Sequence, residues 1–332
     1  MVEIIAELAQ GFEGKPEQAR LLLKAAAKAG ADAAKFQMIF ADELATPDYQ
    51  HYKLFRSLEM DDAVWSSLND YAAELGIALY ADIFGTKSLS LAEKIGLSTV
   101  KLHGTDISNI GFLEQVATSG VQKIQLGAGG AYAGEIEQAL EILSGKHVVV
   151  LLGFQSYPTP NESNQIARVK ILAEQFVKKY KNVEIGFADH ASPDTPFAIA
   201  LAATAIGAGA KIIEKHLTLG KVMQLEDHES ALNPDEFAQF CSVIRGCAAA
   251  FGSCQSVSDF GMSEEEKGYR QMIRRHVVSI RELPANTVLS PADLTLKRAS
   301  AKDVITDIEW AYGKTLKRSL QANAALATSD LD

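Results

Sequence analysis

The chain has 332 residues, of which 47% are hydrophobic and 22% are charged, and its formal net charge is −10 at pH 7. This length suits one large α/β domain with a small second domain. The acidic residues are spread along the chain, which argues against a protein that binds nucleic acid or anionic membranes. A small anionic substrate in a locally basic pocket remains compatible with this balance.

The first residues of the sequence pass directly into a predicted strand. They lack the basic region and the long apolar region of a signal peptide. The three cysteines, Cys241, Cys247 and Cys254, fall in one region and indicate a helix face more readily than a disulfide framework. We therefore expect a cytoplasmic protein.

Short apolar runs alternate with helical patterns through the first part of the chain. Strands are predicted at 4–8, 33–36, 78–81, 99–102, 123–126, 148–152, 183–187 and 210–213. Helices are predicted at 16–29, 61–75, 87–95, 110–117, 134–143, 166–180, 196–206 and 234–251. Eight strands, each followed by a helix, in about 250 residues predict a (β/α)8 TIM barrel. An open doubly wound sheet is the alternative, but no glycine-rich phosphate turn follows the first strand.

The pattern changes after residue 251. We predict a barrel domain over 1–251, a linker over 252–272 and a small α+β domain over 273–332. Short strands are expected near 275–280 and 294–297, with a one-turn helix at 292–294. A domain of about 60 residues has a marginal core of its own. We therefore expect it to pack on the barrel or on a second subunit.

Polar residues follow nearly every predicted strand, where the active site of a TIM barrel forms. They are Glu7, Lys35, Gln37, Asp82, Lys101, His103, the glycine-rich turn 127–130, Tyr157, Asp189, His190, Glu214 and His216. Lys35 and Lys101 each continue an apolar run without a break, so we expect both inside the barrel mouth. An ammonium group there is costly unless an anion or a carboxylate meets it. Two such lysines favour a phosphate or carboxylate ligand.

His190 and His216 are 26 positions apart (216 − 190), the length of one strand-helix unit. They are therefore expected at the same edge of two adjacent parallel strands. Spacing alone leaves two readings open, a divalent-metal site and a pair of hydrogen-bonded core histidines. Mn²⁺, Mg²⁺, Fe²⁺ and Zn²⁺ all suit two imidazoles completed by oxygen ligands, and we expect Mn²⁺ or Mg²⁺.

These motifs resemble the sialic acid synthase family. The similar segments are 4–7, 30–37, 157–160, 186–190, 214–218 and 227–234, and the tail from 275 to 298 is similar to the family's antifreeze-like (SAF) domain. The resemblance covers nearly the whole chain in order. Its most specific parts are Asp189-His190, Glu214-Lys215-His216 and the combination of barrel and tail.

The resemblance implies a metal-dependent condensation of phosphoenolpyruvate with the aldehyde of a 2-acetamido sugar. The product would be a nine-carbon nonulosonic 2-keto acid for surface polysaccharide biosynthesis. The roles that it implies for individual residues are as follows: a metal on His190 and His216, phosphoenolpyruvate on Lys35 and Lys101, proton transfer by Glu7, contacts to the sugar by Asp227, and binding of the sugar by Arg298 from a partner subunit. A domain-swapped homodimer follows from the last role. We also place Gln37, Tyr157 and Asp189 among the substrate-binding residues, and Asp227 and Glu214 among the catalytic ones.

The sequence departs from the family pattern around the anion. Gly104, Gly127 and Ala188 stand where the family has serines near the phosphate, and 82–84 (Asp-Ile-Phe) stands where it has a Ser-Thr-Pro turn. Each lost hydroxyl would remove a charge-assisted hydrogen bond worth about 1.5 to 3 kcal/mol. We therefore expect a rebuilt anion site.

The identity of the sugar also stays open, because the family includes enzymes with legionaminic and pseudaminic type substrates. Two further functions remain as alternatives. One is a non-catalytic carbohydrate-binding paralogue, and the other is a metal-dependent barrel aldolase or lyase, of which a Schiff-base enzyme using Lys35 or Lys101 is a variant.

Overall fold

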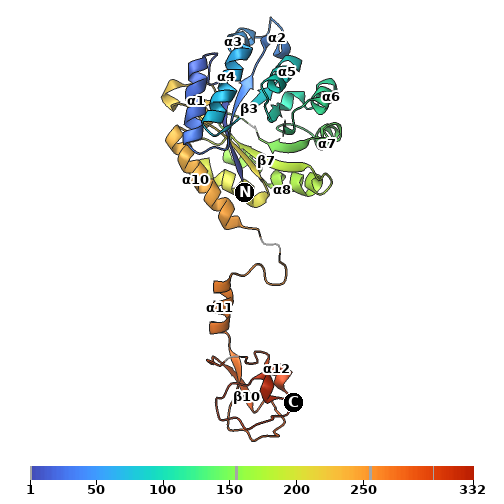
Figure 1. Cartoon of the computed structure of the whole chain (residues 1–332), viewed down its shortest axis with the longest axis vertical. Helices are drawn as coiled ribbons and strands as arrows, with labels where there is room; N and C mark the ends of the chain where they lie inside the picture. The colour runs from blue at the N-terminus through green and yellow to red at the C-terminus, as the bar shows by residue number, and fades with distance from the viewer. Residues whose placement is uncertain (1, 154–155, 254–255, 302) are drawn as a thin grey trace. The chain divides into compact units, whose positions relative to one another are not determined.

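The computed structural model describes residues 2–332 except 154–155, 254–255 and 302. The chain divides into two compact units, residues 1–252 and 253–332 (Figure 1). In the described part of the chain, no helix has both the length and the apolar character needed to cross a membrane.

The first unit is a closed barrel of eight parallel strands that follow one another in chain order. The strands are β1 (Glu3–Ala9), β2 (Ala33–Met38), β3 (Ala78–Ile83), β4 (Thr99–Leu102), β5 (Lys123–Gly127), β6 (His147–Leu152), β7 (Val183–Asp189) and β8 (Ile212–His216). The predicted TIM barrel is confirmed. The eighth strand differs in its bounds, because Glu214 and His216 belong to the strand and not to the loop after it.

Helices surround the barrel (Figure 1). They are α1 (Pro16–Lys28), α4 (Asp62–Glu74), α5 (Thr86–Lys94), α6 (Ile110–Thr118), α7 (Ala133–Ile142), α8 (Ala167–Leu172), α9 (Phe197–Ala208) and α10 (Pro234–Phe251). The predicted helix over 166–180 is α8 followed by a π-helical turn, Ala173–Val177. Two short helices after β2, α2 (Ala41–Leu44) and α3 (Tyr52–Ser57), were not predicted, since neither is long enough to show a helical period.

The barrel packs apolar side chains both outside and inside its sheet. Between sheet and helices, the rings of Phe12, Phe36 and Trp65 meet edge to face at 5.5 to 6.1 Å. Inside, a separate apolar layer is formed by Ile5, Ala33, Tyr80, Val149 and Ile212. Side chains alternate along a strand, so the residues two positions further on, toward the carboxyl ends, also face the interior. Those residues include Glu7, Lys35, Asp82, Leu151 and Glu214, and they form the base of the site described below.

The second unit contains α11 (Glu264–Ile273), β9 (His276–Ser279), β10 (Leu294–Lys297) and α12 (Ile308–Ala311), with β9 and β10 paired antiparallel. Its core is a cluster of leucines with Val277, Ile305 and Ala311. The α11 helix lies in the predicted linker and begins with a capping box: Ser263 Oγ accepts from Glu266 N at 3.1 Å, and Glu266 Oε2 accepts from Ser263 N at 2.9 Å.

The predicted one-turn helix at 292–294 is wrong. The segment is a turn in which the Asp293 carboxylate accepts hydrogen bonds from the backbone N and the Oγ of Ser290, at 3.0 and 2.6 Å. Leu294 already belongs to β10. The aspartate side chain thus reaches back to the backbone N–H three residues before it, as the acidic residue of a capping box does.

Candidate active site

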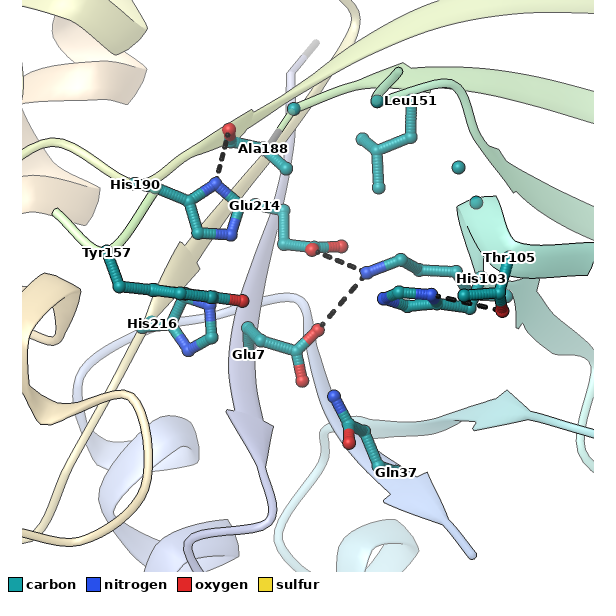
Figure 2. Close-up of a pocket in the computed structure, with 15 residues that line it drawn as sticks. Glu7, Gln37, His103, Thr105, Leu151, Tyr157, Ala188, His190, Glu214 and His216 are labelled. Atoms are coloured by element: carbon teal, nitrogen blue, oxygen red, sulfur yellow. Dashed lines mark hydrogen bonds and ion pairs between the residues drawn. The ribbon is translucent and has the colours of Figure 1, made fainter. Parts of the chain in front are cut away.

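A cavity of about 360 Å³ opens at the carboxyl ends of the barrel strands (Figure 2). The residues that line it are Glu7, Gln37, Lys101, His103, Gly104, Thr105, Gly127, Gly129, Leu151, Gly153, Tyr157, Ala188, His190, Glu214 and His216. Most of the residues predicted for catalysis, substrate or metal therefore meet around one space. In Figure 2 the carboxylates of Glu7 and Glu214 lie between two walls, one with His190, His216 and Tyr157 and the other with His103 and Thr105.

Lys35 lies directly beneath the cavity and has no exposed side-chain surface. Its Nζ lies 3.0 Å from Glu7 Oε2 and 3.4 Å from Asp82 Oδ1, and it donates a short hydrogen bond to Glu214 Oε2. It also donates to Gln125 Oε1 at 3.4 Å. The prediction that Lys35 sits inside the barrel and meets an anionic group is confirmed, and the anions are the protein's own carboxylates.

Lys101 contacts the same three carboxylates from the side of the cavity. Its Nζ lies 3.0 Å from Glu214 Oε1, 3.3 Å from Asp82 Oδ2 and 3.6 Å from Glu7 Oε2, and its side chain is 13% exposed. Burial alone would lower the pKa of Lys101, but Asp82, Glu214 and Glu7 together raise it well above its usual value. Lys101 is thus held as an ammonium ion, which argues against a Schiff-base role.

The pKa values of Glu7 and Glu214 are shifted in opposite directions. Burial raises the pKa of Glu7 to about 8, and the attraction of Lys35 offsets only part of this effect. Burial acts on Glu214 in the same direction, yet Lys101 and Lys35 outweigh it and lower the pKa of Glu214 far below its usual value. Two neighbouring carboxylates therefore differ in protonation at neutral pH, the pattern that separates an acid from an anionic partner in enzyme sites.

His190 and His216 form a pair on one wall of the cavity. Their ring centroids are 5.1 Å apart, and the Tyr157 ring meets both edge-on at 5.1 and 5.8 Å. His190 Nδ1 lies 3.1 Å from the carbonyl oxygen of Ala188, and His216 Nδ1 lies 3.8 Å from Asp227 Oδ2. Burial lowers the pKa of His190 to about 4 and that of His216 well below its usual value, so both imidazoles are neutral.

Neutral imidazoles are the form that binds divalent metals. Within the described residues, however, no group of three His, Cys, Asp or Glu side chains is close enough to hold a metal ion by itself. The pair therefore fits a site in which the protein supplies two nitrogen ligands and the remaining ligands are oxygens of water or substrate. Asp227, whose pKa is raised to about 7 by burial and by Glu226 and Glu229, lies beside this pair.

Asp189 does not line the cavity, in contrast to its predicted role in substrate binding. It is buried, and its Oδ1 lies 3.2 Å from Lys215 Nζ and accepts from Ala191 N at 2.8 Å. Lys215, also buried, donates to the Ala191 carbonyl at 2.8 Å. This pair ties the ends of β7 and β8 together beside the two histidines, which makes Asp189 a positioning residue.

The backbone closes around the positions where the family's serines are missing. A Cβ on Gly127 would lie 2.9 Å from Gly104 N and 3.1 Å from Leu102 O, and a Cβ on Gly104 would lie 3.1 Å from Gly129 O. A Cβ on Gly153 would lie 2.6 Å from the Cβ of Ala188. A side chain at Gly127 or Gly153 would therefore require its neighbours to shift, and one at Gly104 would fit only tightly. The rebuilt anion site stays a prediction.

A second cavity of about 570 Å³ adjoins the first and shares Gln37, His103, Thr105 and Tyr157 with it. The loop and helices after β2 give it an apolar wall that the sequence did not indicate. Its other lining residues are Gln10, Leu44, Ala45, Thr46, Tyr49, Phe55, Phe84, Glu226 and Asp227. None of the described lining residues is a lysine or arginine. We call this space the outer chamber.

Arg298 follows β10 in the second unit, where its side chain is exposed. The cavity and the outer chamber are built by the first unit alone. The role of Arg298 in sugar binding and the domain-swapped dimer therefore stay predictions.

This chain combines a TIM barrel, which carries paired imidazoles and a lysine-carboxylate cluster at its carboxyl end, with a small α+β domain. The chain belongs to the NeuB family, which matches residues 22–256, and a SAF domain matches residues 274–332. The resemblance to the sialic acid synthases is thereby confirmed.

Named relatives agree with this assignment. The chain is 31% identical to the spore coat polysaccharide biosynthesis protein SpsE of Bacillus subtilis over 258 residues, 74% of this chain and 67% of that protein. It is 29% identical to the N,N'-diacetyllegionaminic acid synthase of Campylobacter jejuni over 315 residues, 89% of this chain and 90% of that protein. A crystal structure of the sialic acid synthetase of Leptospira borgpetersenii in complex with citrate superimposes with a TM-score of 0.71 at 27% identity, over 82% of this chain and 92% of that chain.

Proposed function

We propose that the protein condenses phosphoenolpyruvate with the open-chain aldehyde of a 2-acetamido sugar, giving a nonulosonic 2-keto acid and phosphate for surface polysaccharide biosynthesis. The observation that carries the proposal is the meeting of two neutral imidazoles and the lysine-carboxylate cluster across one cavity of about 360 Å³. The names of the relatives support a nonulosonic acid as the product.

The residues of the cavity have separate parts in this reaction. A divalent cation held by His190 and His216 would act as a Lewis acid on the aldehyde. Lys101 faces the donor's anionic groups, and Lys35 keeps the carboxylates beneath in place. Glu7 carries a proton at neutral pH, so it can donate it to the aldehyde oxygen as the enol carbon attacks the aldehyde carbon. Attack by the methylene carbon leaves a cation at the carbon that bears the phosphate oxygen, and water adds there and loses one proton to give a hemiketal phosphate. The bond from this carbon to the phosphate oxygen then breaks, phosphate leaves with the bonding electrons, and the remaining hydroxyl proton is lost as the keto group forms.

The outer chamber suits the sugar. It offers the side-chain amides of Gln10 and Gln37, which are hydrogen-bonded to each other at 2.8 Å, and an aromatic pair, Tyr49 and Phe55, stacked at 6.0 Å. Glu226 and Asp227 give it acidic character. These features favour an uncharged sugar with hydroxyl and acetamido groups over a phosphorylated one.

The test is release of phosphate from phosphoenolpyruvate in the presence of Mn²⁺ and a panel of 2-acetamido hexoses, with the His190→Ala variant as the control. Release that depends on both the sugar and the metal supports the proposal. Silence across a broad panel, with circular dichroism showing an intact fold, contradicts it.

A non-catalytic carbohydrate-binding protein is the second candidate. It is favoured by the pairing of both lysines with carboxylates of the protein itself. Calorimetry distinguishes the two, because this candidate predicts binding of a sugar with no measurable binding of phosphoenolpyruvate.

A further inference from the structure

Asp82 is a buried carboxylate that reaches both lysines of the site. It lies on β3, opposite Gln37 of β2 and Lys101 of β4 in the strand register. Its side chain has no exposed surface, and its two oxygens lie 3.4 Å from Lys35 Nζ and 3.3 Å from Lys101 Nζ. It stands in the segment that replaces the family's Ser-Thr-Pro turn.

The lysines are the sole compensation that the described residues offer to this carboxylate. Neither Asp82 oxygen has a hydrogen-bond partner, so ion pairing with the two ammonium groups offsets the loss of hydration. Asp82 therefore needs both ammonium groups as its counter-charges, and each ammonium group is in turn held in an ion pair with Asp82.

The net charge of this lysine-carboxylate cluster depends on the groups that it contains. Asp82 joins Glu7 and Glu214, so three carboxyl groups face two ammonium groups. The cluster carries one net negative charge when all five groups are ionised and no net charge when Glu7 keeps its proton. Lys101 is the one lysine or arginine among the described residues lining the cavity. A phosphate entering this cavity thus meets a lysine-carboxylate cluster without net positive charge.

The same cavity lacks serine hydroxyls at the positions where the family pattern places them. The positions of the family's phosphate-binding serines are Gly104, Gly127 and Ala188, and the backbone has closed around the two glycines. Lys101 is the one lysine or arginine that the described lining residues offer to an anion, and Asp82 competes for it at 3.3 Å.

We infer that Asp82 sets the affinity and charge preference of the cavity for its anionic donor, by holding Lys35 and Lys101 in ion pairs that an incoming phosphate must weaken. The inference rests on the proposed function for the identity of the donor as phosphoenolpyruvate. Removing the Asp82 charge makes the net charge of the cluster more positive by one, whether or not Glu7 is protonated, so the anion meets a more favourable cluster.

The experiment measures binding, not turnover. Isothermal titration calorimetry on the full-length protein, with and without Mn²⁺, compares the wild type with Asp82→Asn and Asp82→Thr, using phosphoenolpyruvate, inorganic phosphate and pyruvate as ligands. Both variants are expected to bind phosphoenolpyruvate and phosphate at least about tenfold more tightly, and pyruvate, with its single charge, with a smaller gain. Asp82→Glu, which keeps the charge, is expected to show no gain.

Asp32→Asn is the matched control, because it also removes one negative charge. Asp32 precedes β2 at the opposite end of the barrel, where it pairs with Arg245 at 2.6 Å. The phosphate affinity of the Asp32→Asn variant should equal that of the wild type. A gain in Asp32→Asn as large as in Asp82→Asn would show an effect of net charge alone and would overturn the inference.

Unchanged or weaker phosphate binding in folded Asp82→Asn or Asp82→Thr would also overturn it. If one variant does not fold, the other decides. The inference and the proposed function fail separately: a gain in phosphate affinity without turnover on any sugar leaves the role of Asp82 standing, whereas turnover without a gain in affinity leaves the proposed reaction standing.

Discussion

Glu7 and Lys35 occupy paired positions on β1 and β2, and Glu7 Oε2 lies 3.0 Å from Lys35 Nζ with both side chains buried. Neither group can regain water without opening the barrel mouth. The pair therefore links the stability of the barrel to the chemistry of its site, because two of the carboxylates that hold Lys35, those of Glu7 and Glu214, also line the cavity.

Replacing Lys35 with methionine should destabilise the barrel strongly. The change leaves Glu7, Asp82 and Glu214 with Lys101 as their remaining cationic partner, and removing one member of a buried ion pair costs about 3 to 5 kcal/mol. The measurement is the free energy of unfolding in urea.

Lys94→Met is the control for Lys35→Met. Lys94 pairs with Asp62 at 2.7 Å on the surface, where a pair contributes about 0 to 1 kcal/mol. Adding Asp82→Asn to Lys35→Met should recover part of the loss, because it removes one unpaired carboxylate. Equal stability of Lys35→Met and Lys94→Met would contradict the structural role of the cluster.

Glu7→Gln should change how stability depends on pH. Burial raises the pKa of Glu7 to about 8 in the folded protein, above the usual 4.5, so between these values the folded state keeps a proton that the unfolded state loses. The contribution of this group to the free energy of unfolding is complete at pH values below its unfolded-state pKa. It is lost as pH rises through its folded-state pKa, with a slope of up to about 1.4 kcal/mol per pH unit.

The glutamine variant cannot lose this proton, so its unfolding free energy relative to the wild type should rise from pH ~5 to ~8. Urea titrations at several pH values measure this difference. A difference that stays constant, or that falls with pH, would show that Glu7 is ionised in the folded protein. The same variant should lose turnover if Glu7 donates the proton in the proposed reaction.

The barrel could be predicted from the sequence because each strand-helix unit repeats the same pattern of an apolar run and an amphipathic helix. The bounds of β8 could not. Glu214, Lys215 and His216 look like the start of a loop, yet all three are buried, since two of them face the barrel interior and Lys215 pairs with Asp189. A buried polar residue is stable where another strand supplies its partner, and a single strand does not reveal that partner.

The same reason limited the prediction of the site. The sequence indicated that Lys35 and Lys101 would need anionic partners, but those partners come from β1, β3 and β8, and only the register of the closed barrel brings them together. Asp189 was assigned to the substrate because it adjoins His190, whereas its side chain points to Lys215. The outer chamber depends on loop residues near α2 and α3, which have no periodic signal.

Mn²⁺ should raise the thermal midpoint of the wild-type protein if His190 and His216 bind it, because a ligand that binds only the folded state stabilises it. The expected rise is lost in His190→Ala and in His216→Ala, and excess chelator reverses it in the wild type. His147→Ala is the control, since that imidazole is 46% exposed and pairs with Glu184. A midpoint that rises equally in all four proteins would place the metal elsewhere.

Asp293→Asn should weaken the second unit and reduce its sensitivity to acid. The Asp293 carboxylate accepts from Ser290 N and Oγ and pairs with Arg281 Nη2 at 2.6 Å, and the bonds from Ser290 lower its pKa. A lowered pKa in the folded state gives stability that is present above the unfolded-state pKa and is lost as pH falls through the folded-state pKa.

Amide hydrogen exchange measures this loss of stability. In the full-length wild-type protein, exchange of β9 and β10 should accelerate as pH is lowered through the folded-state pKa of Asp293, after correction for intrinsic rates. The variant should exchange faster at neutral pH, by the equivalent of about 1 kcal/mol, and respond less to acid. Asp303→Asn, an exposed aspartate in the same unit, should behave as the wild type, and a wild-type response to acid in Asp293→Asn would assign the acid sensitivity to another group.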